Sequence, residues 1–186
     1  MSSREQYQPG PAAGAEVHQD GERWTLVLVR ELHHAPSKIW QALTDPTLLR
    51  EWAPFDADRS LAAAGPVRLT TVGMPKPVIS DTQVTRADAP RRLEYRWADH
   101  DLRWQLEPIG LGTRLTLWHT LDQRFISMAA AGWHICLDVM DRQLAGAPVG
   151  RIVAGDAMKF GWPRLNVEYA QHFGLGSPGA PDIPSG

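Results

Sequence analysis

The chain has 186 residues and carries 19 Lys and Arg against 21 Asp and Glu, a formal net charge of −2. This length fits one domain with tails, and the balanced charge provides no basic stripe for a nucleic-acid partner. No apolar run approaches the length of a membrane span, the first residues lack a signal-peptide core, and the single Cys136 excludes an internal disulfide. We therefore expect a cytoplasmic protein without membrane insertion, as a monomer or a homodimer.

Both ends of the chain are polar and rich in glycine and proline. This composition predicts a disordered arm over residues 1–22 and a disordered tail over 175–186. Between them we expect one domain over 23–147 and a helical extension over 148–174 that packs on it.

The domain is expected to begin with a strand over 24–32, which is rich in β-branched residues and leucine and has no glycine or proline. Pro36 then fits the first turn of a helix over 37–43, because a proline loses no hydrogen bond there. A second short helix is expected over 47–52.

Further strands separated by turn signals follow these helices. Five are expected, over 67–72, 78–85, 91–97, 102–107 and 113–121. The segment Asp99-His100-Asp101 is typical of the tight turn between the third and the fourth. Apolar and charged residues alternate along these strands, which predicts an antiparallel sheet covered on one side.

A long amphipathic helix is expected over 131–146. Trp133, Cys136, Leu137 and Met140 share its apolar face, which makes Cys136 a buried core residue rather than a nucleophile. His134 lies on the opposite face, either solvated or packed on the extension. Strands followed by one long helix indicate an α+β fold in which a curved sheet grips its last helix.

Several motifs follow one another in a characteristic order. Arg30-x-Leu32-x-x-Ala35-Pro36 precedes Trp40-x-Ala-Leu-Thr-Asp-Pro46 and Trp52, and later come Pro90-Arg-Arg-Leu-Glu-Tyr-Arg-Trp97, Gly112-Thr-Arg-Leu-Thr-Leu-Trp-His119 and Gly132-Trp-His-x-x-Leu137. Over about residues 24–146 this order resembles the START-like (SRPBCC) superfamily. The later motifs are similar to its bacterial activator of Hsp90 ATPase homologue 1-like branch.

The resemblance implies a helix-grip fold, with two short helices after the first strand and an apolar cavity between the curved sheet and the long helix. Members of the superfamily bind lipids, hormones or polyketides, and some act as cyclases or dehydratases. The eukaryotic co-chaperone that names the branch has a separate N-terminal Hsp90-binding domain, which a 22-residue arm cannot supply. We therefore do not expect an Hsp90-type chaperone as a partner.

One histidine and several large apolar side chains are expected to line this cavity: Trp52, Trp97, Trp104, His119, Trp133, Leu137 and Met140. Large flat groups that converge on one space pack well only if side chains or a ligand fill the centre. His119 has two interpretations, a core histidine bonded within the sheet or a polar anchor or general acid/base in the cavity. Asp81 and Asp99 are the carboxylates that strand order brings near it.

Three functions follow from these observations. The first is binding of a small hydrophobic or aromatic ligand, without cofactor or metal. The adjacent His33 and His34 would point to opposite sides of an extended strand, so they cannot chelate a metal together without a third partner. The second is a cofactor-independent cyclase, dehydratase or hydrolase that uses His119, and the third is a protein-interaction module, as a chaperone regulator or the partner of a bacterial regulator.

Overall fold

The structure is a computed structural model and describes residues 3–176. Eight strands, four α-helices and two short 3-10 helices make up this part of the chain. In order they are β1 (Ala15–Asp20), β2 (Arg23–Leu32), α1 (Pro36–Thr44), α2 (Pro46–Leu49), β3 (Phe55–Ala57), β4 (Gly65–Thr71), β5 (Val78–Asp88), β6 (Arg92–Trp97), β7 (His100–Ile109), β8 (Gly112–Leu121), η1 (Gln123–Phe125), α3 (Ile126–Leu144), η2 (Ala154–Phe160) and α4 (Trp162–His172).

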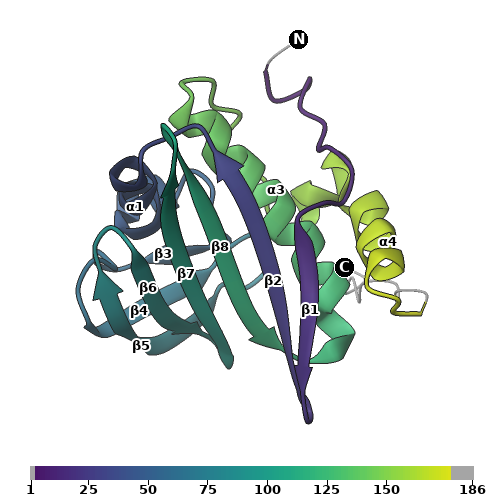
Figure 1. Cartoon of the computed structure of the whole chain (residues 1–186), viewed down its shortest axis with the longest axis horizontal. Helices are drawn as coiled ribbons and strands as arrows, with labels where there is room; N and C mark the ends of the chain where they lie inside the picture. Colours follow the sequence, from purple (N-terminus) through teal and green to yellow (C-terminus); the bar gives the residue numbers. More distant parts are fainter. Residues whose placement is uncertain (1–2, 177–186) are drawn as a thin grey trace.

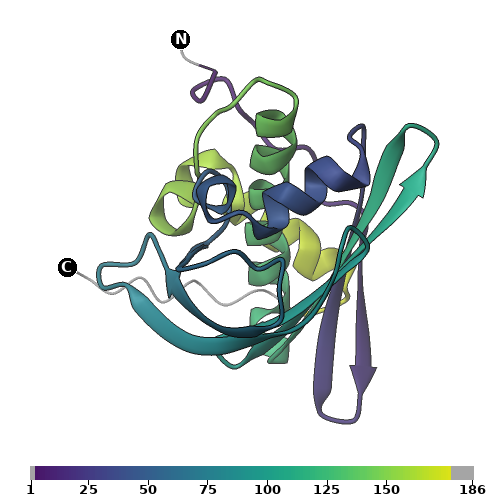
Figure 2. The ribbon, with the colours of Figure 1, turned by 90° about the vertical axis from the view of Figure 1, so that its left-hand side faces the viewer.

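The strands form one antiparallel sheet in the order β1-β2-β8-β7-β6-β5-β4-β3. The sheet curls, and α3 crosses its concave side together with α1 and α2, as Figures 1 and 2 show. Apolar residues alternate along β6, β7 and β8 and face α3, which buries them. The predicted α+β helix-grip fold is confirmed.

Local sequence explains where the helices begin and end. Pro36 opens α1, and Asp45 accepts a hydrogen bond from the Thr47 amide to cap α2. The long helix starts at Ile126, five residues before the expected start at 131. It ends before Gly146, which adopts φ +79° and donates its amide to the Gln143 carbonyl.

The N-terminal arm is ordered where the structure describes it, which corrects the expectation of disorder over 1–22. Residues 15–20 form β1 on the edge of the sheet, and Tyr7 is only 2% exposed. Arg4 donates hydrogen bonds to the carbonyls of Val149 and Arg151. Composition predicted disorder because a few anchoring side chains, rather than a continuous apolar pattern, hold this segment in place.

The chain after α3 packs on the outer side of that helix. In Figure 1, α4 and the N-terminal arm lie beside one another, on the side of α3 away from the sheet. Leu165 and Tyr169 of α4 are fully buried there, and Ile152 is 1% exposed. Of the tail expected to be disordered over 175–186, residues 177–186 lie outside the described part of the chain.

Candidate functional site

The structure brings the seven predicted cavity residues into one core, where most of their rings touch. The ring centroids of Trp52 and Trp104 are 6.2 Å apart, and Trp133 lies 5.4 Å from Trp104 and 5.9 Å from Trp97. All three of these contacts are edge-to-face, a favourable geometry for aromatic pairs. One and two turns after Trp133, Leu137 and Met140 are 2% and 0% exposed.

The side chains of this core become more exposed toward the end where β6 turns into β7. Strand pairing aligns a middle row of concave-face residues from β2, β8, β7 and β6, all at most 2% exposed: Leu26, His119, Leu102 and Tyr95. The next row, at the β6–β7 turn, comprises Trp24 paired with Leu121 and His100 paired with Trp97. Trp24, His100 and Trp97 are partly exposed. We call this row the rim, and it marks where the concave face meets solvent.

His119 is enclosed by two hydrogen-bond partners. The indole Nε1–H of Trp133 donates to His119 Nδ1 at 3.0 Å, and His119 Nε2 lies 2.9 Å from Nδ1 of His100. Burial lowers the pKa of His119 to about 3, with a smaller contribution from His100. His119 is therefore a neutral core histidine that bonds to a neighbouring strand and to α3.

Neither of the two carboxylates that strand order brings near His119 bonds to it. Asp81 instead pairs with Arg68 at 2.7 Å, and no hydrogen bond joins Asp99 to His119 in the part of the chain described. The second partner is His100, which the sequence pattern placed in a turn. The turn consists of Ala98 and Asp99, so His100 is the first residue of β7 and faces the core.

Ala98 explains why this turn was misplaced by one residue. Its φ of +51° lies in the left-handed region, where glycine, asparagine or aspartate is usual. A residue with a β-carbon is strained there by roughly 1 kcal/mol. The turn nonetheless fixes Trp97 and His100 side by side at the rim.

Thr71, the last residue of β4, connects the rim to the far edge of the sheet by a hydrogen bond. Its hydroxyl accepts a hydrogen bond from Trp97 Nε1 at 2.9 Å, and Phe55 lies 5.3 Å from the Trp97 ring. The three tryptophan N–H groups of the inner core also have partners. Trp52 donates to the Ala42 carbonyl, Trp104 donates to the Tyr95 hydroxyl, and Trp133 donates to His119 as described above. These bonds fix the orientation of each ring.

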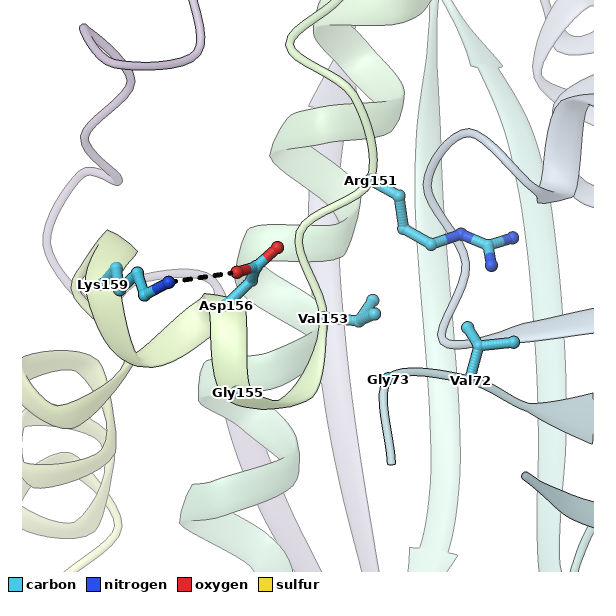
Figure 3. A pocket seen from close by; sticks show the side chains of 7 residues that line it. All are labelled: Val72, Gly73, Arg151, Val153, Gly155, Asp156 and Lys159. Carbon is cyan, nitrogen blue, oxygen red and sulfur yellow. Dashed lines mark ion pairs between the residues drawn. The ribbon is translucent and has the colours of Figure 1, made fainter. Parts of the chain in front are cut away.

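A pocket of about 640 Å³ begins one residue beyond Thr71 (Figure 3). Its lining residues are Val72, Gly73, Arg151, Val153, Gly155, Asp156 and Lys159. The cations in it are already paired, Arg151 with Asp56 at 2.6 Å and Lys159 with Asp156 at 3.6 Å. A second pocket, of about 690 Å³, lies near the β5–β6 turn, and neither pocket is lined by any of the seven predicted residues.

The outer face of α3 carries a separate buried cluster. His134 is 5% exposed, and its Nδ1 lies 2.8 Å from the hydroxyl of Tyr169 on α4. Of the two sequence-based alternatives for His134, packing on the extension is the one observed. Cys136 is buried, and burial raises the pKa of its thiol to about 12, which is unfavourable for a nucleophile.

Comparison with known families gives one match over most of the chain. The family described as polyketide cyclase/dehydrase and lipid transport matches residues 23–156. No curated protein sequence shows a significant match. Within the described residues, no helix is long and apolar enough to cross a membrane.

Several solved structures share the fold. A conserved protein of unknown function from Enterococcus faecalis is 16% identical, with a TM-score of 0.64 over 85% of this chain and 89% of its own. CalU16 from Micromonospora echinospora is 17% identical, with a TM-score of 0.61 over 84% and 94%. An AHSA1-like protein from Aeromonas hydrophila is 19% identical, with a TM-score of 0.52 over 65% and 93%. At these identities the likeness concerns the fold alone.

Proposed function

The chain belongs to the polyketide cyclase/dehydrase and lipid transport family of the START-like (SRPBCC) superfamily, and from this premise we propose that it binds a small hydrophobic or aromatic molecule between the sheet and α3. The observation that supports the proposal is the rim, where aromatic rings of the core meet solvent beside a polar histidine. An apolar wall with a few placed polar groups is typical of small-molecule sites.

The ligand would enter at Trp97 and contact the outer part of the aromatic core. Trp97 is the partly exposed member of the seven predicted residues, and its ring contacts both His119 and Trp133. The other four would form the wall behind them: Trp52, Trp104, Leu137 and Met140. The α3 residues Met128 and Ala129 are partly exposed one turn before Trp133, so this end of the helix is also open to a ligand.

A cofactor-independent cyclase or dehydratase is the second candidate, and the histidine pair favours it. In that case His100 rather than His119 would face the substrate, because both ring nitrogens of His119 are engaged by protein groups. The cytoplasmic location expected from a free cysteine remains part of the proposal.

A titration with 2-isopropenylnaphthalene tests ligand binding, because this apolar aromatic probe quenches tryptophan fluorescence when it lies near the rings. We expect saturable binding by the wild type and a loss of about tenfold in affinity in Trp97→Ala, since an aromatic contact and the apolar area that it buries together contribute about 1.4 kcal/mol. Trp118→Ala is the matched control, because Trp118 lies on the other face of β8 under Arg103. Equal affinity in both variants, or no saturable binding, would overturn the proposal.

A further inference from the structure

Within the proposed binding site, and resting on that proposed function, we infer that His100 Nε2–H donates a hydrogen bond to an uncharged oxygen of the ligand. The ligand class is then an aromatic ketone, quinone, ester or lactone rather than a pure hydrocarbon or a carboxylate. The inference follows from the direction of one hydrogen-bond chain.

The chain begins at Trp133, whose indole N–H can donate but cannot accept. His119 Nδ1, 3.0 Å away, must therefore be the acceptor and carry no proton. His119 is 2% exposed and neutral, so its single proton lies on Nε2. Each step is fixed by the chemistry of the donor before it.

His119 Nε2–H then donates to His100 Nδ1 at 2.9 Å. Because His100 Nδ1 accepts, the proton of a neutral His100 lies on Nε2. Protonation of His100 at Nδ1 would place two N–H groups against each other. Burial also lowers the pKa of His100, against smaller opposing contributions from Asp99 and Asp101.

The outward nitrogen of His100 has no hydrogen-bond partner among residues 3–176. Asp101 does not supply one, since its carboxylate pairs with Arg23 at 3.5 Å and Arg96 at 3.3 Å. His100 is partly exposed and pairs across the turn with Trp97, so its free N–H lies at the aromatic rim.

A ligand that covers this N–H without an acceptor would leave a buried donor unpaired, which weakens binding. An oxygen acceptor avoids that penalty. A carboxylate gains less, because the donor is a neutral ring and the two cations beside His100, Arg23 and Arg96, are already paired with Asp101. The site therefore favours a neutral carbonyl at the edge of an aromatic ring system.

Three naphthalene probes of similar shape test this selectivity: 2-acetonaphthone, its alkene isostere 2-isopropenylnaphthalene, and 2-naphthoate. We expect the wild type to bind the ketone about tenfold more tightly than the alkene and the carboxylate more weakly than the ketone. In His100→Phe the preference for the ketone over the alkene should fall below about twofold. His18→Phe, the same substitution on the exposed edge strand β1, should keep the full preference.

The outcomes separate this inference from the proposed function. If the ketone and the alkene bind the wild type equally and saturably, the binding function stands and the role of His100 fails. If no probe binds, the proposed function fails and the inference fails with it. Tightest binding of 2-naphthoate, or a ketone preference unchanged in His100→Phe, would also overturn the inference.

The tautomers themselves provide a test without any ligand. Long-range ¹H–¹⁵N spectra of the wild type at neutral pH should show both His100 and His119 protonated at Nε2 and unprotonated at Nδ1. His100→Gln offers a folded alternative if His100→Phe is unstable, because glutamine can accept from His119 and still donate outward. It should keep a ketone preference of at least about threefold, and a His100 resonance protonated at Nδ1 would contradict the chain.

Discussion

A buried histidine lies on each side of α3, and the two have very different surroundings. His119 faces the inner side of the helix and is bonded to Trp133, while His134 belongs to the outer side and is bonded to Tyr169. Burial is the main cause that lowers both pKa values, to about 3 for His119 and to about 4 for His134. Titration alone would not distinguish the two.

The polar groups of the outer cluster lie against other protein groups. Tyr169 also receives a hydrogen bond from Arg30 and contacts the Ala13 carbonyl, while Asp138, 3.6 Å from His134 Nε2, accepts from the Tyr7 hydroxyl at 2.8 Å. Each member is covered by the arm or by α4. The outer cluster therefore holds the N-terminal arm and α4 against α3.

The inner chain, in contrast, ends at the second ring nitrogen of His100, a partly exposed residue. Trp133, His119 and His100 are ordered by one donor direction, and the last donor is unpaired within the described residues. The second ring nitrogen of His134 thus lies against the Asp138 carboxylate, 3.6 Å away, whereas the last donor of the inner chain meets no described protein group. We take the inner chain as the site that recognises a ligand.

Trp133→Ala should produce the largest effect and test the packing of the inner side. We expect the free energy of unfolding to fall by about 3–5 kcal/mol, because a buried indole and its bond to His119 are both lost. Urea denaturation measures this loss. Trp118→Ala is the control and should cost about 1 kcal/mol, since that ring is partly exposed on the other face. Equal losses would show that the inner side is not close-packed.

Tyr7→Phe should produce the next largest effect and test the outer side. It removes the hydroxyl that donates to the partly buried Asp138 carboxylate, and we expect a loss of about 2 kcal/mol in the free energy of unfolding. Gln8→Ala changes an exposed neighbour and should stay within about 0.5 kcal/mol. If Tyr7→Phe also stays within that limit, the arm is held by other contacts.

The overall fold could be predicted from the sequence because strand alternation and helix periodicity are local signals. The strands from 24 to 121, except the three-residue β3 (Phe55–Ala57), and the apolar face of α3 follow from such patterns. The start of the arm could not be predicted in this way, since Tyr7 and Arg4 are held there by contacts with residues more than 130 positions away. The average composition of a segment does not reveal single residues that hold it in place.

The site was predictable in part, for the same physical reason. Alternation correctly placed His119 on the dry face, but its partner depended on the exact position of a turn. Ala98 adopts a backbone conformation that alanine rarely takes, so the Asp99-His100-Asp101 segment was the better turn candidate by residue type. A shift of one residue moves a side chain to the other face of a strand, and this concealed His100.

Acid pH should lower the free energy of unfolding through both buried histidines, His119 and His134, to a similar extent. Because both histidines have folded-state pKa values below the usual 6.5, the unfolded chain binds more protons below that pH. The free energy of unfolding should therefore be largest above about pH 6.5. As the pH falls toward 4, it should decrease by up to about 1.4 kcal/mol per pH unit for each histidine.

Urea denaturation at several pH values measures these slopes. His119→Gln and His134→Gln should each remove one histidine's share of the slope. A variant of either buried histidine that keeps the wild-type slope would mean that this ring is already protonated in the folded protein.

Tyr169→Phe should have the smallest effect on stability and should leave ligand affinity unchanged. It removes the hydroxyl that joins His134 to the arm, and we expect a loss of about 1 kcal/mol in the free energy of unfolding. The affinity for 2-acetonaphthone should stay within about twofold, because no bond of the inner chain passes through Tyr169. A larger change in affinity would show that the two sides of α3 are coupled, and the helix would then transmit the state of the arm to the rim.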